Sequence, residues 1–231
     1  MAEPSASFRV LETARDVAAA TAQTILAAAQ RAIAERGRFQ LVLAGGRTPL
    51  AAYALLVDAP ADWSRWYLFL GDERCLPADD TERNSVAAAR AWVDQVPVSA
   101  ERVHWIPAEL GAPEAARRYA ALLAPRLPFD LVLLGMGDDG HTASLFPGHP
   151  VPPEPLVIAV RDAPKPPPER VSLTPRALVA SRELLILATG ADKSAALAAW
   201  RAGADLPVAR VASLGRARVL VDRAAADGAV S

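Results

Sequence analysis

Residues 129–135 read FDLVLLG, and the chain continues with GMGDDGHTASLFPG over residues 135–148. The run 129–134 is too short for a typical helix and is largely apolar on both faces, which is typical of a central strand in a parallel sheet. We therefore predict a buried strand here. It leads directly into a loop that is rich in glycine and in side chains capable of chemistry.

Strand-like and helix-like segments alternate on either side of this strand. The expected strands are 39–44, 66–70, 103–106, 156–160, 171–173, 184–188 and 217–221, and the expected helices are 11–36, 49–57, 84–93, 114–123, 175–180 and 192–202. Repeated strand-then-helix units predict an α/β fold around a mainly parallel sheet flanked by helices, with right-handed crossovers. From the length of 231 residues we expect a single domain, 1–231.

The composition excludes several classes of protein. Apolar residues make up 52% of the chain and charged residues 22%, which is typical of a globular protein. The net charge of -1 provides no global field that would attract nucleic acid or an anionic membrane. No apolar run is long enough to span a bilayer, and residues 1–25 lack the apolar stretch of a signal peptide. The single Cys75 excludes an intramolecular disulfide, and together these features favour a cytoplasmic protein.

Four motifs follow predicted strands and carry most of the polar chemistry. They are AGGRTP (44–49), GDER (71–74), GMGDDGHTASLFPG (135–148) and TGADK (189–193). Ligands of parallel α/β sheets bind beyond the carboxyl ends of the strands. We therefore expect these four motifs to converge on one site, although they lie far apart in the sequence.

The first motif suits an anion. Its residues offer unhindered backbone N–H groups and a hydroxyl at a helix N-terminus, where unpaired amides and the helix dipole favour phosphate; they are Gly45, Gly46, Arg47 and Thr48. The alternative is a tight turn in which glycine serves the geometry alone, and it stays open. This motif is neither a Walker A loop nor G-x-G-x-x-G, so nucleotide binding by it gets little support.

His141 is the candidate general base. An imidazole is near neutral at physiological pH, so it can take a proton from water during hydrolysis and return it to a leaving oxygen. The alternative is a histidine tied into the hydrogen bonds of its own loop. His104 is expected to be structural, and His149 is expected to be a loop residue.

A metal site and a serine nucleophile are the other chemical possibilities in this segment. Asp138, Asp139, His141 and His149 form a dense group of potential ligands, but no HExxH or Cys/His pattern occurs. Ser144 lacks the G-x-S-x-G turn of a serine nucleophile. We expect no metal and no cofactor.

Charged side chains near the strand ends are candidates for substrate binding. Arg74 is suited to clamp a phosphate through two hydrogen bonds while Asp72 orients sugar hydroxyls, although the two can also form a self-satisfied ion cluster with Glu73. Lys193 is either a second phosphate cation or a solvated lysine. Arg170 precedes a predicted strand and is as well suited to a structural role as to binding.

Four segments resemble, in order and spacing, signatures of the 6-phosphogluconolactonase family. They are AGGRTPLAAY, FLGDERCLPADDTERNS, FDLVLLGMGDDGHTASLFPG, and VIAV followed by ERVSLTP. The resemblance runs from about residue 8 to about residue 222, and DGHTASLFPG is its most specific part. It implies a Rossmann-like sheet of the sugar-phosphate isomerase/deaminase-like superfamily. The implied reaction is hydrolysis of 6-phospho-D-glucono-1,5-lactone to 6-phospho-D-gluconate in the oxidative pentose phosphate pathway.

The resemblance also implies roles for individual residues. His141 would activate water, and the phosphate would lie against the loop 45–48, Arg74 and Lys193. Many relatives have Ser or Asn where this chain has Arg47, which either adds a charge to the phosphate site or faces solvent. Backbone N–H groups would stabilise the oxyanion, but the sequence does not indicate which ones. Whether Asp72 acts in the chemistry or only in binding stays open.

Two rival functions differ from the lactonase in the residues they need. Deaminases of the superfamily carry an acidic residue five places after the histidine, where this chain has Phe146, and this difference favours the lactonase. A non-catalytic sugar-phosphate sensor would need Lys193 but not His141. We expect a monomer or weak homodimer that binds a small sugar-phosphate lactone and neither nucleic acid nor membrane.

Overall fold

The computed structural model describes residues 6–227 of the protein. A seven-stranded parallel sheet forms its frame. The strands lie in the order β1-β10-β9-β6-β2-β3-β5, and all neighbours in this order run parallel. A smaller antiparallel sheet has the order β4-β8-β7. The predicted α/β fold with a mainly parallel sheet is confirmed.

Strands and helices alternate along most of the chain. The strands are β1 (Ala6–Leu11), β2 (Phe39–Leu43), β3 (Trp66–Leu70), β4 (Asp72–Arg74), β5 (Val103–His104), β6 (Phe129–Gly135), β7 (Val157–Val160), β8 (Arg170–Leu173), β9 (Ser181–Ala188) and β10 (Ala217–Asp222). The α-helices are α1 (Ala14–Arg36), α2 (Arg47–Ala54), α3 (Asn84–Ala91), α4 (Ala112–Leu123), α5 (Pro175–Val179), α6 (Ser194–Arg201), α7 (Pro207–Gly215) and α8 (Arg223–Asp227). The 3₁₀ helices are η1 (Trp63–Arg65), η2 (Val93–Gln95), η3 (Ala100–Arg102), η4 (Ala108–Leu110), η5 (Ala124–Arg126) and η6 (Ala191–Lys193).

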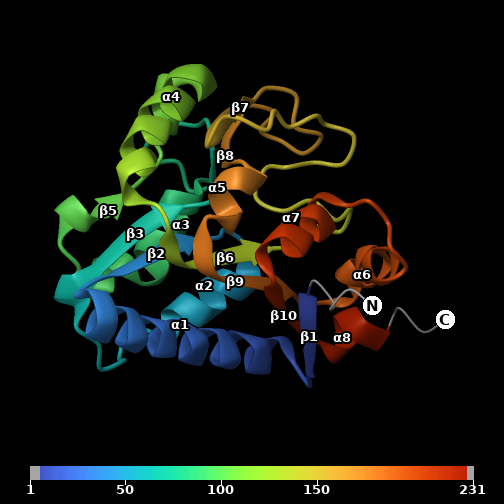
Figure 1. Ribbon diagram of the computed structural model, residues 1–231, viewed down its shortest axis with the longest axis horizontal. Helices are drawn as coiled ribbons and strands as arrows, with labels where there is room; N and C mark the ends of the chain where they lie inside the picture. The colour runs from blue at the N-terminus through green and yellow to red at the C-terminus, as the bar shows by residue number, and fades with distance from the viewer. Residues whose placement is uncertain (1–5, 228–231) are drawn as a thin grey trace.

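Helices cover both faces of the large sheet (Figure 1). α1 and α2 lie along one face, where α1 contacts β2, β6 and β10. The other face carries α4, α5 and α7 together with the small antiparallel sheet, which packs against α4. Among the helices of residues 6–227, none combines the length and the apolar character needed to cross a membrane.

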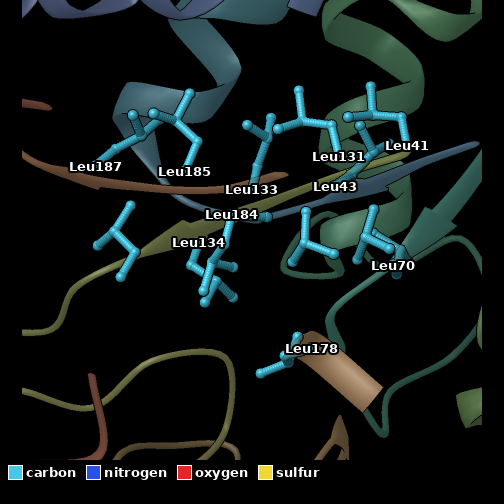
Figure 2. Packing of buried hydrophobic residues seen from close by; sticks show 14 of the residues in the cluster. Leu41, Leu43, Leu70, Leu131, Leu133, Leu134, Leu178, Leu184, Leu185 and Leu187 are labelled. Atoms are coloured by element: carbon cyan, nitrogen blue, oxygen red, sulfur yellow. The ribbon is translucent and has the colours of Figure 1, made fainter. Parts of the chain in front are cut away.

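β6 lies in the middle of the large sheet, between β2 and β9. All of its residues from Phe129 to Leu134 are buried. Figure 2 shows Leu131 and Leu133 on one side of the strand and Leu134 on the other, so β6 packs on both faces. Since burial of one such side chain stabilises a protein by about 1.5–3 kcal/mol, this strand anchors the core.

The prediction of a helix from residue 11 was wrong. Residues 6–11 form β1, which pairs with β10 at the edge of the sheet, and α1 begins only at Ala14. A capping box sets this start: the Thr13 hydroxyl accepts from the Asp16 N–H at 3.2 Å, and the Asp16 carboxylate accepts from the Thr13 N–H at 3.1 Å. The partly exposed edge strand carries too weak an apolar pattern to be distinguished from the alanine-rich helix that follows.

Other boundaries differ by a few residues. GDER, predicted as a strand end, contains the short strand β4, which pairs with β8. The predicted helix 192–202 divides into η6 and α6, and residues 208–214, for which the sequence indicated no element type, lie in α7. β9 begins at Ser181, before the predicted start at residue 184. None of these differences moves a motif away from its strand end.

Two buried tyrosines bind backbone groups where β2 and β3 end. The Tyr53 hydroxyl, on α2, accepts from the Ala44 N–H at 2.9 Å and contacts the Ala44 carbonyl at 3.0 Å. The Tyr119 hydroxyl, on α4, accepts from the Leu70 N–H at 2.8 Å and lies 3.2 Å from the Leu70 carbonyl. Both helices are thereby tied to the carboxyl ends of the strands, where the polar motifs lie.

Replacing either tyrosine by phenylalanine should destabilise the protein. Tyr53→Phe and Tyr119→Phe each leave a buried backbone N–H without a partner, so each should lower the free energy of unfolding by about 1–3 kcal/mol in urea denaturation. Tyr67→Phe is the matched control, because Tyr67 is the remaining tyrosine of the chain and its side chain is partly exposed. Equal losses in all three variants would contradict the assignment.

Candidate active site

A cavity of about 330 Å³ lies at the carboxyl ends of β2, β6 and β9, and all four predicted motifs contribute to its lining. The order of the strands reverses here, because β2 leads outward to β3 and β5 whereas β6 leads outward to β9 and β10. The connections on the two sides diverge and leave a crevice at such a switch point. The fold therefore brings together side chains that lie far apart in the sequence.

The His141 ring lies in this cavity, directly after β6. Its Nδ1 is 2.5 Å from Oδ1 of Asp139, which also accepts the His141 backbone N–H at 3.0 Å. A Cβ atom at Gly137 would lie 2.0 Å from this Nδ1, so only glycine lets the imidazole approach the backbone here. Phe146 packs against the imidazole with 4.8 Å between ring centroids. The histidine is therefore held at one nitrogen and along its ring.

Burial and two neighbouring charges set the protonation of His141. Burial lowers the pKa of its imidazole below the ordinary value, the Asp139 carboxylate opposes this, and the ammonium of Lys165 adds to the lowering. Burial raises the pKa of Asp139, but the hydrogen bonds from His141 and the positive charges of His141 and Lys165 together lower it below the ordinary value and keep this carboxylate ionised. An ionised Asp139 at Nδ1 selects the tautomer with its proton there. Nε2 is then left as a proton acceptor.

Asp72 is buried at the wall of the cavity and joins three segments. Its carboxylate accepts from the Ser144 hydroxyl at 2.6 Å and from the Asn84 amide at 3.2 Å. Asn84 in turn fits against the glycine loop, since a Cβ atom at Gly45 would lie 2.1 Å from the Asn84 Oδ1. The sequence prediction did not single out Asn84, although it lies near the end of the quoted segment FLGDERCLPADDTERNS, and it reaches the site because α3 packs beside β4.

Glu73 and Arg74 point to different environments. The Glu73 side chain is fully buried, lies 3.4 Å from Nε of the buried Arg83, and accepts the backbone N–H groups of Asn84 and Ser85 at 2.7 and 2.8 Å. The Arg74 guanidinium lines the cavity, where Nη1 donates to the Glu82 carbonyl and Nε is buried without a hydrogen-bond partner in residues 6–227. Within residues 6–227 no ion pair joins Arg74 to Asp72 or Glu73, so the alternative of a self-satisfied ion cluster does not describe these three side chains.

The predicted phosphate-binding residues meet at the N-terminus of α2. Gly46 has φ 100° and precedes Arg47, whose exposed side chain lines the cavity. The Thr48 hydroxyl lies 2.5 Å from that of Thr189, which joins the first motif to the fourth. Lys193 also lines the cavity, and its ammonium lies 3.0 Å from the Asp192 carboxylate.

Arg170 lines the cavity, but its guanidinium is used within the protein. Nε donates to the Pro167 carbonyl at 3.1 Å, and Nη2 donates to the Lys165 and Pro166 carbonyls at 2.9 and 3.1 Å. Lys165, which the sequence prediction missed, lies in the loop between β7 and β8. Its ammonium contacts the Asp138 carboxylate and lies 4.0 Å from that of Asp139.

The other predicted residues divide between the cavity and the scaffold. His104 is packed between Tyr67 and Phe69 on the sheet, away from the cavity. The two ring nitrogens of His149 lie 3.1 Å from the carbonyls of Pro147 and Asp162. Both histidines are thus in structural positions.

One group of side chains has the composition of a metal site. Ligand atoms of Asp138, Asp139 and His141 lie within 4.8 Å of one another. The Lys165 ammonium already lies against both carboxylates, so a metal ion would have to displace a cation from the same place. In the described part of the chain this group fits an ammonium better than a divalent metal.

Comparison with known proteins identifies relatives over nearly the whole chain. Residues 12–220 match the family model of glucosamine-6-phosphate isomerases/6-phosphogluconolactonase. The chain is 42% identical to a 6-phosphogluconolactonase of Streptomyces coelicolor, over 91% of this chain and 89% of that protein. The crystal structure of 6-phosphogluconolactonase from Thermotoga maritima is 29% identical, with a TM-score of 0.86 over 94% of this chain and 99% of that one. A monomeric glucosamine-6-phosphate deaminase, 20% identical with a TM-score of 0.81 over 96% and 99% of the chains, shares the fold.

NMR titration of the three histidines should place the pKa of His141 below the ordinary value of about 6.5. Asp139→Asn removes the negative charge that opposes the lowering, so the pKa of His141 should fall further. Asp138→Asn is the matched control, because that carboxylate faces Lys165, and it should change the pKa of His141 less. A higher pKa of His141 in Asp139→Asn would refute this account.

Proposed function

The chain belongs to the glucosamine-6-phosphate isomerase/6-phosphogluconolactonase family as a 6-phosphogluconolactonase enzyme, and we propose that His141 is the general base of its lactone hydrolysis. The observation that carries this proposal is the Asp139–His141 pair at 2.5 Å, which faces a cavity lined by several cationic side chains. The cavity is large enough for one small sugar phosphate.

The proposed reaction needs one base and one water molecule. Nε2 of His141 takes a proton from water as the water oxygen bonds to the lactone carbonyl carbon, which gives a tetrahedral oxyanion. When this intermediate collapses, the bond between that carbon and the ring oxygen breaks, and the imidazolium returns its proton to the ring oxygen. Asp139 stabilises the imidazolium between the two steps and holds the ring in place.

Two alternative nucleophiles are poorly placed for a covalent route. The Ser144 hydroxyl is buried and donates to Asp72 at 2.6 Å, and its oxygen has no bond to a histidine in residues 6–227. Burial raises the pKa of the Cys75 thiol to about 11, so little reactive thiolate is present at neutral pH. Both features support direct attack by water.

The phosphate of the substrate is proposed to bind between α2 and η6. The N-terminus of α2 offers backbone N–H groups, and Arg47, Arg74 and Lys193 supply positive charge around the same cavity. The Arg74 Nε, buried and unpaired within the described residues, is a donor that a phosphate or hydroxyl oxygen would satisfy. In this arrangement Arg47 adds a charge to the site.

Asp72 is proposed to act in binding and not in proton transfer. Its carboxylate is occupied by Ser144 and Asn84, but a carboxylate has about four acceptor positions. The remaining lone pairs are available to sugar hydroxyls.

Replacing His141 tests the base directly. The EDTA-treated protein should hydrolyse freshly prepared 6-phosphogluconolactone well above the spontaneous rate, and His141→Asn should reduce kcat by about 10²–10⁴-fold. His149→Asn, with ring nitrogens on loop carbonyls, is the control and should retain most activity. Full activity in His141→Asn would exclude this mechanism.

Replacing Lys193 tests the phosphate site. Lys193→Met should raise KM for the phosphorylated lactone about tenfold or more, because a charged hydrogen bond of about 1.5–3 kcal/mol is lost. Hydrolysis of unphosphorylated gluconolactone should change little. Arg201→Met, at the far end of α6 where the guanidinium packs on Phe8, is the matched control. A proportional loss on both lactones would place the phosphate elsewhere.

A further inference from the structure

We propose that Arg170 is a positioning residue, which fixes His141 and the loop 161–169 at the reaction centre, and not a ligand of the substrate phosphate. This inference rests on the proposed function of His141. It concerns a buried cation that lines the catalytic cavity but is held by groups of the protein itself.

The first support is the set of hydrogen bonds that Arg170 makes. The residue begins β8, where it pairs with Arg74 of β4 on one side and Val160 of β7 on the other. From this fixed backbone, Nε and Nη2 reach three successive carbonyls of the loop, those of residues 165–167. The side chain is only 5% exposed. A guanidinium in this position folds the loop back over its own strand.

The second support is the contact between Arg170 and Phe146. The guanidinium carbon lies 5.5 Å from the centre of the Phe146 ring, within the range of a cation–π contact. The same ring packs against the imidazole of His141. Arg170 therefore reaches the proposed base through one intervening ring.

The third support is the position that the loop gives to Lys165. Because Arg170 holds the carbonyl of Lys165, the ammonium of this lysine is directed at the carboxylates of Asp138 and Asp139. Asp139 is the partner of His141. Arg170 thus influences both sides of the imidazole, through Phe146 at the ring and through the loop at Asp139.

Arg170 has no free edge with which to clamp a phosphate through two parallel hydrogen bonds, because Nη2, which belongs to both paired-donor edges of the guanidinium, already donates to two loop carbonyls. Only Nη1 makes no hydrogen bond within residues 6–227, and a contact through this one group is weaker than a two-bond clamp. Three other cationic residues line the same cavity and make fewer hydrogen bonds within residues 6–227; they are Arg47, Arg74 and Lys193. The geometry therefore assigns Arg170 to the scaffold of the base.

Steady-state kinetics separates the two roles. In Arg170→Met and Arg170→Lys we expect kcat to fall by about 10–100-fold, the effect of a displacement near 1 Å at a reacting group, while KM stays within about threefold. Lysine should not rescue kcat, since it cannot reproduce the planar fork of donors. Phe146→Leu should give the same loss in kcat and carries the test if Arg170→Met does not fold.

The opposite pattern would overturn the inference. A KM raised about tenfold with kcat retained in Arg170→Met, and largely restored in Arg170→Lys, is what a phosphate cation predicts. Lys193→Met provides that pattern as a reference in the same assay.

NMR of the histidine rings gives a second measurement that does not depend on turnover. Arg170→Lys should shift the ring signals of His141 and leave those of His104 unchanged, whereas Lys193→Met should leave both unchanged. Unshifted His141 signals in Arg170→Lys would refute the positioning role. If the wild-type protein hydrolyses no lactone, the proposed function fails, but the NMR spectrum still tests whether Arg170 positions His141. If the wild-type protein is active and substitution of Arg170 changes KM but not kcat, this inference alone fails.

Discussion

β6 has no solvent-facing side, and the rest of the structure depends on that constraint. A strand packed on both faces and bonded on both edges can present polar groups only at its ends. At its carboxyl end the neighbouring connections diverge, because β2 continues to β3 on one side and β9 continues to β10 on the other. The motif with His141 begins at this point, so the apolar core itself determines where the chemistry is located.

Buried polar groups hold the loops at the carboxyl ends of the strands. The Glu73 carboxylate binds Arg83 and the first amides of α3, and its neighbour Asp72 binds Asn84 and the Ser144 hydroxyl. Breaking a buried ion pair by removing one partner typically costs about 3–5 kcal/mol, because the other charge is left unpaired. These contacts join β4, α3 and the loop after β6 without using the core. The loops of the cavity wall are thus tied to β4 and α3 by hydrogen bonds and one ion pair.

The sequence predicted those parts of the site that follow from strand order. Motifs at the ends of central strands meet in any parallel sheet, so the cavity positions of His141, Asp72 and Lys193 were accessible from spacing alone. Asn84 and Lys165 were missed because they enter the site through the packing of α3 and of the β7–β8 loop, which leaves no periodic signal. Whether Arg170 binds substrate or serves a structural role was undecided for the same reason. At the edge, β1 was missed because an exposed strand has little apolar pattern.

Apart from Arg47, the cationic residues that line the cavity already have polar partners within residues 6–227. Lys193 lies against Asp192, Lys165 lies against Asp138, and Arg74 donates to a backbone carbonyl. Binding of an anion is therefore an exchange reaction, in which the gain is the difference between new and existing contacts. The affinity of the cavity for a phosphate is consequently lower than the number of its cationic residues alone would suggest.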